Sequence, residues 1–584
     1  MDVFKFWIQR RKRKISKSIN KLGKINEAKK QKIKQSIKKV LKTFGLRMTP
    51  VEKKFSILEK EFKLEKHKSN NNKALFTHSF GIYAPSYIHD KLMAYALSLR
   101  GFDIHATFCD GIQDIECNVY GGIWGGGNNF KKNCQNCQSK SQELWSFLNP
   151  NHIFKYSNYL KQEDYAKIEA ILEKIPNDKW TNHYEDGWDI GFWAKDILVN
   201  NYVVADYKLI KNHEQLGRSH LKNLLLCKIA CEKIIEEMQP DRIISNDSYY
   251  GMWKIWEFLA KKHSIPFYSH WVGTRVGGWS YAYNDASMNL DFSPSWENYS
   301  KIPLTNDEKN RVEKWLIDRM AGKEMIIDTA SLASYKNEDF DLTKIDITKP
   351  TALLSANVVW DLAALNKEVF NRSMADWIIE TIKWFKQYPE YQLIIKPHPA
   401  EFFPGIPETK ETVLSMIEKE FSEIPENIFV LSPKVSISVY DLLPLSKVGL
   451  VFTTSVGMEM AARGIPVITA GKSHYRGYGF TYDPPSQLEY FEILKNILDN
   501  NQEVDRTNMI DLSMKFIKFN FFHYFSKVGL MEFSIGKEKK SDTDIKIDTI
   551  LQLKKGHNLY FDYVLDCIET GDGILTEYKW MKES

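Results

Sequence analysis

Two apolar, β-branched runs, each ending in a polar motif, most strongly constrain the fold of this 584-residue chain. The first, residues 392–396, leads into K-P-H-P-A-E at 396–401, and the second, residues 449–453, leads into T-T-S-V-G-M-E at 453–459. Both runs alternate along the chain with segments of helical spacing, which predicts parallel strands joined by helices. Because ligands bind at the carboxyl ends of strands in open α/β sheets, both motifs are expected at a ligand-binding edge.

The alternation predicts a doubly wound parallel sheet in the second half of the chain and a further α/β unit in the first half. A chain this long is expected to form two large domains, because one compact core rarely exceeds about 300 residues. The expected strands are 74–77, 103–109, 241–245 and 265–268, then 352–355, 392–396, 427–431, 449–453 and 466–469. The predicted organisation is a basic N-terminal segment (1–54), an N-terminal domain (55–300), a linker (301–349), a C-terminal domain (350–505) and a C-terminal helical extension (506–584).

Charge is unevenly distributed along the chain. The first 50 residues hold 17 Lys/Arg and two acids, whereas the remaining residues hold 63 Lys/Arg and 72 acids. The main body is therefore mildly acidic, which argues against nucleic acid as a partner. No apolar run approaches the ~20 residues of a membrane span, and the apolar start at residues 4–8 is too short for a secretory signal.

The basic N-terminal segment, residues 1–54, has helical spacing. Phe4, Trp7 and Ile8 precede five consecutive basic residues, and apolar residues then recur at helical spacing from Ile15 to Ile25 and again from Ile33 to Phe44. A basic amphipathic helix with aromatic residues at one end predicts binding to an anionic membrane surface, where each Lys or Arg contributes about 1 kcal/mol. We therefore expect a cytoplasmic protein, peripheral on the inner face of the membrane. A solvated helix or a disordered tail is the alternative.

Four of the seven cysteines are close in sequence. They are Cys109, Cys117, Cys134 and Cys137, with the last two forming a C-x-x-C pair. Such a group is able to hold a structural zinc ion, but the spacing is irregular, and four reduced thiols are the favoured interpretation. Apart from that zinc, no metal and no cofactor are expected.

The K-P-H-P-A-E motif combines a cation with an imidazole at the end of a strand. Lys396 and His398 can donate hydrogen bonds to phosphate oxygens, and the flanking prolines, Pro397 and Pro399, hold the histidine in extended geometry. A hydrogen-bonded core histidine is the alternative. The pattern favours a phosphate contact.

The T-T-S-V-G-M-E motif places hydroxyls and a glycine at the expected start of a helix. Thr454, Ser455 and Gly457 are expected there to present backbone N–H groups to an anion. Glu459 falls in the first turn, where a carboxylate interacts favourably with the helix dipole or bonds to ribose or sugar hydroxyls.

Two further segments follow strands of the second domain. Asn357 is the second residue after the strand at 352–355. The loop H-Y-R-G-Y-G-F-T at 474–481 contains Tyr475 and Gly477, and its glycines allow close approach of a ligand. A plain mobile loop is the alternative for the second segment.

These motifs carry a family resemblance. In order and spacing, K-P-H-P-A-E, T-S-V-G-M-E and H-Y-R-G-Y-G-F-T resemble the capsule polysaccharide biosynthesis family, a group of GT-B glycosyltransferases that includes bacterial Kdo transferases. The resemblance covers residues 350–485 well and residues 73–290 loosely. It implies two Rossmann-like domains facing a cleft, with a nucleotide-sugar donor in the C-terminal domain and the acceptor and catalytic base in the N-terminal domain. By this resemblance His398 and Ser455 contact donor phosphate, Glu459 contacts the nucleotide sugar, and catalysis needs no metal.

The catalytic base is expected at a strand end of the N-terminal domain, because an attacking hydroxyl needs a carboxylate or an imidazole to take its proton. The candidates are His78, Asp110, Asp247 and His270. Asp247 is favoured, since the sequence S-N-D-S follows a clear buried strand and precedes a helix. A helix N-cap is the alternative role for Asp247.

The combined prediction is a glycosyltransferase that moves a sugar from a nucleotide sugar to a glycan acceptor, expected to be lipid-linked, in surface polysaccharide biosynthesis. One alternative is a polyol-phosphate transferase of the teichoic-acid type. Another is a non-catalytic scaffold of a glycan-assembly complex. A sugar epimerase is less favoured, because it needs neither an acceptor nor a membrane tail.

Overall fold

The computed structural model describes residues 48–65, 69–79, 83–117, 122, 130–249, 251–323, 338–360, 366–402, 409–535 and 541–574. Most of the basic N-terminal segment lies outside these residues, so its helix and its membrane contact stay predictions. The chain divides into two compact units, residues 1–64 with 548–550 and all remaining residues. No helix in the described ranges is both long enough and apolar enough to cross a membrane.

The smaller unit is built around α3 (Pro50–Phe62). Thr49 and Glu52 form a capping box that satisfies free N–H groups at its start. Near its other end Glu61 accepts hydrogen bonds from the Thr549 hydroxyl and the Ile550 N–H, both 2.8 Å long. These contacts join segments almost 500 residues apart in the sequence.

The two main sheets of the larger unit share the order of their five parallel strands. The first sheet has the order β12-β6-β5-β4-β1-β2-β3, and the second has the order β11-β10-β7-β8-β9. The strands of these two sheets are β1 (Lys73–Phe76), β2 (Asp103–Phe108), β3 (Ile153–Lys155), β4 (Arg242–Asn246), β5 (Phe267–Val272), β6 (Gly278–Tyr283), β7 (Thr351–Ser355), β8 (Gln392–Lys396), β9 (Ile428–Val430), β10 (Val448–Val451), β11 (Val467–Thr469) and β12 (Ser526–Lys527). Five neighbouring strands of each sheet are parallel in the order 3-2-1-4-5, which is the Rossmann arrangement.

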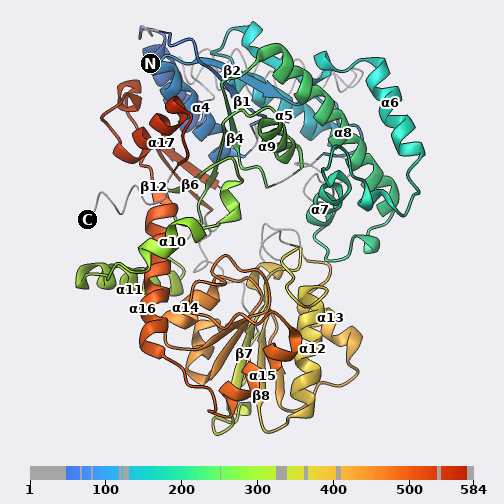
Figure 1. Cartoon of the computed structure of the whole chain (residues 1–584), viewed down its shortest axis with the longest axis vertical. Helices are drawn as coiled ribbons and strands as arrows, with labels where there is room; N and C mark the ends of the chain where they lie inside the picture. The colour runs from blue at the N-terminus through green and yellow to red at the C-terminus, as the bar shows by residue number, and fades with distance from the viewer. Residues whose placement is uncertain are drawn as a thin grey trace, which may run out of the picture. The chain divides into compact units, whose positions relative to one another are not determined.

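Helices join the strands and cover the sheets (Figure 1). They are α4 (Ala84–Leu99), α5 (Phe130–Leu144), α6 (Gln162–Glu173), α7 (Ile190–Tyr202), α8 (His213–Met238), α9 (Gly251–Lys262), α10 (Ser293–Tyr299), α11 (Asn306–Met320), α12 (Met374–Gln387), α13 (Val413–Glu420), α14 (Val456–Ala462), α15 (Gln487–Leu498), α16 (Arg506–Lys518) and α17 (Leu559–Thr570). The capping box at Thr305 and Glu308 starts α11, as its sequence predicts.

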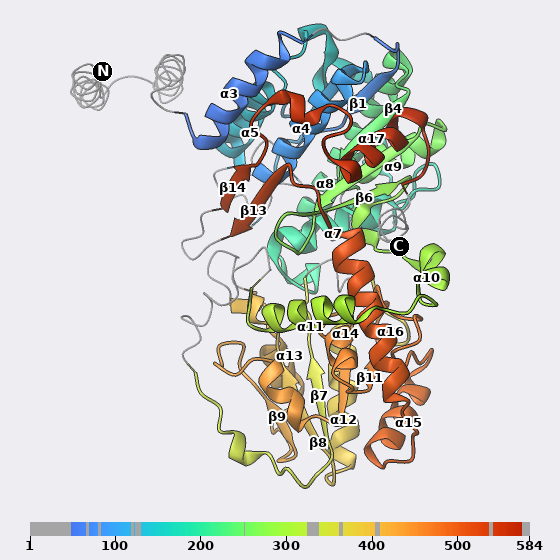
Figure 2. The same cartoon turned by 90° about the vertical axis from the view of Figure 1, so that its left-hand side faces the viewer.

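The second sheet has a core on each face because its strands are buried on both sides. Ala352 and Leu354 point into a core shared with α12, α13 and α15, whereas Leu353, between them, points into a core shared with α11, α14 and α16. In Figure 2, α11 and α16 lie beside α14. Successive side chains along β7 point to opposite faces of the sheet, so alternate residues enter different cores.

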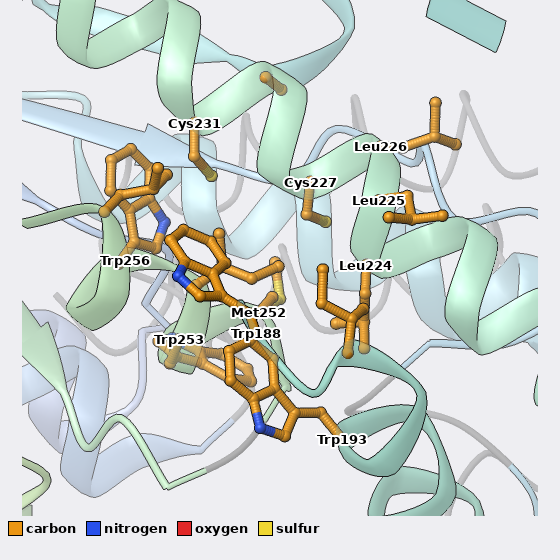
Figure 3. Close-up of a cluster of buried hydrophobic side chains, with 14 of the residues drawn as sticks. Trp188, Trp193, Leu224, Leu225, Leu226, Cys227, Cys231, Met252, Trp253 and Trp256 are labelled. Carbon is orange, nitrogen blue, oxygen red and sulfur yellow. The ribbon is translucent and has the colours of Figure 1, made fainter. Parts of the chain in front are cut away.

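The core on one face of the first sheet is rich in tryptophan. Trp188, Trp193, Trp253 and Trp256 gather there with Leu224–Leu226 from α8 (Figure 3). Cys227 and Cys231 point into the same apolar cluster, where both are buried. These two cysteines are therefore packing residues.

The structure adds strands that the sequence prediction missed. β6 pairs antiparallel with β5, and β12 pairs antiparallel with β6, so the chain returns to the first sheet after the second sheet is complete. Residues 506–584, predicted as a helical extension, therefore contain strands as well as helices, including the hairpin β13 (Met531–Ile535) and β14 (Ser541–Ile545). Isolated two-residue strands such as β12 depend on the partner strand and carry no sequence signal of their own.

Candidate functional site

Each sheet has a switch point where the strand order reverses. The first lies between β1 and β4, and the second between β7 and β10. In doubly wound sheets the crevice for a ligand forms outside the carboxyl ends of these strands. At the second switch point the Asn357 side-chain Oδ1 accepts a hydrogen bond from the Thr453 N–H at 3.1 Å, so it ties the loops after β7 and β10 together.

His398, two residues after β8, is held as a neutral hydrogen-bond donor. Its Nδ1 accepts the Ala400 N–H at 3.1 Å, which leaves the ring proton on Nε2. Burial and the charge of Lys396, the last residue of β8, lower the pKa of His398 to about 4. At neutral pH the ring therefore donates through Nε2–H and adds no charge.

Glu401, from the same motif, has a structural role. Its side chain is fully buried, and Oε1 accepts the Val413 N–H at the start of α13 at 2.9 Å. Burial raises the pKa of Glu401 to about 7. The carboxyl group thus anchors α13 to the loop that carries His398.

Ser455 and Glu459 contact Arg319, a residue of α11 that the sequence analysis placed in the linker. The Arg319 Nη2 donates to Ser455 Oγ at 2.9 Å, and its Nε donates to Glu459 Oε1 at 2.5 Å. Tyr440 donates to the other oxygen, Glu459 Oε2, at 2.6 Å. Both Glu459 oxygens have protein partners, whereas the Ser455 hydroxyl accepts from Arg319 and keeps its own proton to donate.

Gly457 and Tyr475 lie against each other. A Cβ at Gly457 would lie 2.2 Å from Tyr475 Oη, and that hydroxyl donates to the Thr454 carbonyl oxygen at 2.5 Å. Tyr475 is fully buried, so it underlies the motif and does not line an open surface. Glycine at 457 makes room for the tyrosine ring.

The start of α14 differs from the expected anion site. The Gly457 N–H donates to the Thr454 carbonyl at 3.3 Å, and the Met458 N–H donates to the Ser455 carbonyl at 3.2 Å. The helix itself has only seven residues. Its first N–H groups are used in a tight turn, because the chain bends directly from β10 into α14.

The loop after β11 is a braced structure. Arg476 donates to the carbonyl oxygens of Thr469, Asp483 and Pro484 at 2.6–3.0 Å. The Asp483 carboxylate accepts the Gly477 N–H at 2.7 Å. Gly477 has a φ of +86°, and a Cβ added there would meet no heavy atom within 4 Å, so glycine is needed for the backbone conformation and not for space.

At the first switch point, His78 follows β1 and is also held in one tautomer. Its Nδ1 accepts the Cys109 N–H at 3.1 Å, and burial lowers the pKa of the ring to about 4. Because Nδ1 is occupied and Nε2 carries the proton, His78 is better suited to donate a hydrogen bond than to take a proton.

Asp247 follows β4 and has the properties of a proton acceptor. Its side chain is buried, and Oδ1 has no hydrogen-bond partner among the described residues. Burial raises the pKa of Asp247 to about 7, although the N–H groups of Met288 and Ser248 lower it. Helix α9 begins at Gly251, so Asp247 is not the residue that caps it.

The other two candidates at this edge have protein partners. The Asp110 carboxylate accepts hydrogen bonds from the Ser157 N–H, at 3.0 Å, and from the Ser157 hydroxyl, which ties β2 to the segment after β3. His270, on β5, pairs through Nε2 with Asp90 of α4 at 2.7 Å and is buried. The structure thus places His78 after β1 and Asp247 after β4, whereas His270, predicted at a strand end, lies inside β5 opposite Asn246. Asp110 has a bracing contact.

One group of potential metal ligands lies among the described residues. Asp103, His105 and His152 have ligand atoms within 4.8 Å of one another, whereas the four cysteines between residues 109 and 137 do not form such a group. The Gln113 and Gln138 amides donate to the Cys109 and Cys134 sulfurs at 3.7 and 3.3 Å. Burial raises the pKa of Cys109, which favours the thiol form.

Comparisons with known proteins give only distant similarities. No protein-family model matches the chain, and no curated protein matches it. Similar solved structures include Thermosulfurimonas dismutans KpsC, described as a beta Kdo 2,4 transferase and as a beta Kdo 2,7 transferase. Each is 13% identical, over 47% and 49% of this chain and 79% of the other, with TM-scores of 0.29 and 0.28. A UDP-GlcNAc 2-epimerase from Neisseria meningitidis is 10% identical over 76% of this chain and 98% of that chain, with a TM-score of 0.23.

The class of protein therefore follows from the sheets and not from these similarities. The larger unit has two Rossmann-like sheets of one strand order, each with polar side chains at its switch point. This is the α/β, GT-B-like class that the sequence predicts.

Proposed function

We propose that the chain is a GT-B glycosyltransferase that moves a sugar from a nucleotide-sugar donor to a glycan acceptor in surface polysaccharide biosynthesis. The observation that carries this proposal is the contrast between the two switch points. The second holds neutral or cationic donors, His398, Ser455 and Arg319, and the first holds a buried carboxyl group, Asp247, with a pKa near 7. The donors at the second switch point suit a leaving phosphate, and the carboxyl group at the first suits an attacking hydroxyl.

In the proposed reaction Asp247 takes the proton of the acceptor hydroxyl as its oxygen attacks the anomeric carbon of the donor sugar. The bond from that carbon to the phosphate oxygen breaks, and the nucleotide leaves with the bonding electrons. His398 Nε2–H and the Ser455 hydroxyl donate to the departing phosphate, whose negative charge grows as the bond breaks. Arg319 holds the Ser455 hydroxyl in place through Nη2, while its Nε pairs with Glu459.

A lipid-linked acceptor and a location on the inner face of the membrane complete the proposal. The support is the basic, aromatic-headed segment 1–54, whose composition favours an anionic surface. Binding of the full chain to vesicles with and without anionic lipid tests this part, and equal binding to both would contradict it.

The donor is tested by a thermal-shift screen of CMP, CDP, UDP, GDP and their sugars. A nucleotide at 100 times its Kd stabilises the folded state by about 2.7 kcal/mol, so one nucleotide class is expected to raise the melting midpoint selectively. His398→Ala is expected to lose most of that rise, whereas His557→Ala, at an exposed histidine before α17, keeps it. No rise with any nucleotide would favour the scaffold alternative.

The reaction class is tested by analysis of the product. A glycosyltransferase adds a sugar without phosphorus, whereas a polyol-phosphate transferase adds one phosphate for each unit transferred. Phosphorus NMR of acceptor extended by the purified chain separates the two. New phosphodiester signal in the product would overturn the glycosyltransferase proposal and support the polyol-phosphate alternative.

A further inference from the structure

Two lysines from distant parts of the sequence converge on one aromatic ring. Lys254, on α9, and Lys367, in the segment after β7, place their Nζ atoms 5.9 Å and 5.7 Å from the centre of the Tyr249 ring. Tyr249 follows β4, two residues after Asp247. Lys472, after β11, joins them, because its backbone N–H donates to the Lys367 carbonyl oxygen at 2.7 Å.

These three lysines have no ion-pair partner in the part of the chain that the structure describes. Lys261 shows the contrast, since it lies on the same helix over the Phe258 ring, at 5.5 Å, but pairs with Glu257 at 2.5 Å. The pKa of Lys367 is lowered first by burial and then by the charges of Lys254 and Lys472. The three charges therefore oppose one another, and an anion among them would relieve that repulsion.

An acid that interacts with Lys254 is already engaged. Asp196, on α7, accepts from the Asn366 amide at 3.2 Å and lies 3.8 Å from Lys195. Burial raises the pKa of Asp196 to about 6, although Lys195 and Lys254 lower it. One partly neutralised carboxyl group does not balance the surrounding lysines.

The positive region continues toward the proposed donor site. His474 lies near both Lys367 and Arg319, and after burial their charges lower its pKa to about 4. Arg319 in turn contacts Ser455. His474 therefore links the lysine cluster to the Arg319–Ser455 contact of the proposed donor site.

We propose that Lys254, Lys367 and Lys472 form a subsite for an anionic oxygen group, phosphate or carboxylate, of the substrate. Lysine ammonium groups bind such anions as point charges, and the Tyr249 ring, which Lys254 and Lys367 both approach, is suited to pack against a sugar. The inference deepens the proposed function and rests on it. The substrate then carries negative charge beyond the phosphate held by His398, on a charged acceptor or on another part of the donor.

The test uses inorganic pyrophosphate as the probe, titrated calorimetrically into the full chain at low ionic strength, where exposed charges are least screened. Lys254→Ala and Lys367→Ala are each expected to weaken its binding about tenfold, the size of one lost charge-assisted contact. Lys254→Arg is expected to retain binding, which separates a loss of charge from a loss of structure. Lys261→Ala is the matched control and should bind like the natural chain.

Equal pyrophosphate affinity in the natural chain, Lys254→Ala and Lys367→Ala would overturn the subsite. Given lysine-dependent binding, a second titration with the selected nucleotide at saturation identifies the source of the anion. If saturating nucleotide leaves the pyrophosphate affinity unchanged, the subsite is assigned to the acceptor. If the nucleotide competes with pyrophosphate, the subsite is assigned to the donor. Lysine-dependent pyrophosphate binding without any nucleotide binding would leave the anion subsite standing while the glycosyltransferase proposal failed.

Discussion

Gly457→Ala separates two explanations of the glycine in the T-T-S-V-G-M-E motif. The sequence predicts that Gly457 presents its backbone N–H to an anion, whereas the structure places the Tyr475 hydroxyl 2.2 Å from the position of an alanine Cβ. Tyr475 is fully buried and bonded to the Thr454 carbonyl, so it has little room to move. We therefore expect the substitution to act on stability.

The magnitude follows from two opposing effects. Overpacking a well-packed core costs about 1–3 kcal/mol, and the higher helix propensity of alanine returns up to about 1 kcal/mol. The net loss of about 1–2 kcal/mol corresponds to about 2–8 °C in the melting midpoint of a domain of this size. Gly573→Ala, where the nearest atom to a Cβ is at 3.6 Å, is the control and should melt like the natural chain.

A double-mutant cycle with Tyr475→Phe tests the contact itself. Removing the hydroxyl takes away the 2.2 Å contact and leaves the ring carbon Cζ at 2.9 Å, so alanine at 457 should cost less in that background. A coupling of at least about 0.5 kcal/mol is expected for residues in contact. The reasoning fails if Gly457→Ala melts normally but binds the selected nucleotide tenfold more weakly, since glycine would then be serving the ligand.

Three further predictions concern buried charge and metal. Asp247→Asn is expected to abolish turnover and to stabilise the fold at pH 8 by up to about 4 kcal/mol. The reason is that the Asp247 carboxyl has a pKa near 7 in the folded state, so the natural chain loses stability as pH rises from about 4 to 7. The gain should vanish below pH 4 in pH-dependent melting, and a pH-independent difference would contradict the raised pKa. Arg319→Met should cost about 3–5 kcal/mol, since it leaves Glu459 buried without its cation, and Glu459→Gln in the same chain should recover part of that loss. Metal analysis should find no stoichiometric zinc in the purified chain, and one zinc per chain that disappears in Cys137→Ser would reverse the interpretation of the cysteines.

The strands were predictable because buried parallel strands are continuous apolar runs. β8 has the bounds that its sequence predicts, β7 and β11 differ from prediction by one residue at one end, and β10 differs by one or two residues at each end. Residues directly after such strands, including Asn357 and His398, fall at the sheet edge for the same reason. Their position follows from strand direction alone, so it needs no knowledge of tertiary contacts.

The partners of the site residues were not predictable in this way. Arg319 is 140 residues from Glu459 in the sequence, and nothing in α11 distinguishes it from the other basic residues of that helix. Tyr475 has the composition of a binding-loop residue but is buried under the turn that it supports. Such pairs depend on how helices pack, which local patterns do not encode.

An alternating run such as W-S-Y-A-Y in β6 did carry a strand signal.

Asp247 is the residue at which the structural explanations fall short. A carboxylate that caps a helix accepts N–H bonds at its first turn and has a lowered pKa, whereas Asp247 lies before α9 and has a raised pKa. A carboxylate in a structural ion pair resembles Glu459, with both oxygens occupied, whereas Asp247 Oδ1 has no partner among the described residues. Burying such a group costs stability at neutral pH, and the N–H groups of Met288 and Ser248 offset only part of that cost, because the pKa stays raised. The hydroxyl of a bound acceptor would donate a hydrogen bond to Asp247 and then give up its proton, which supplies the partner that Oδ1 lacks among the described residues.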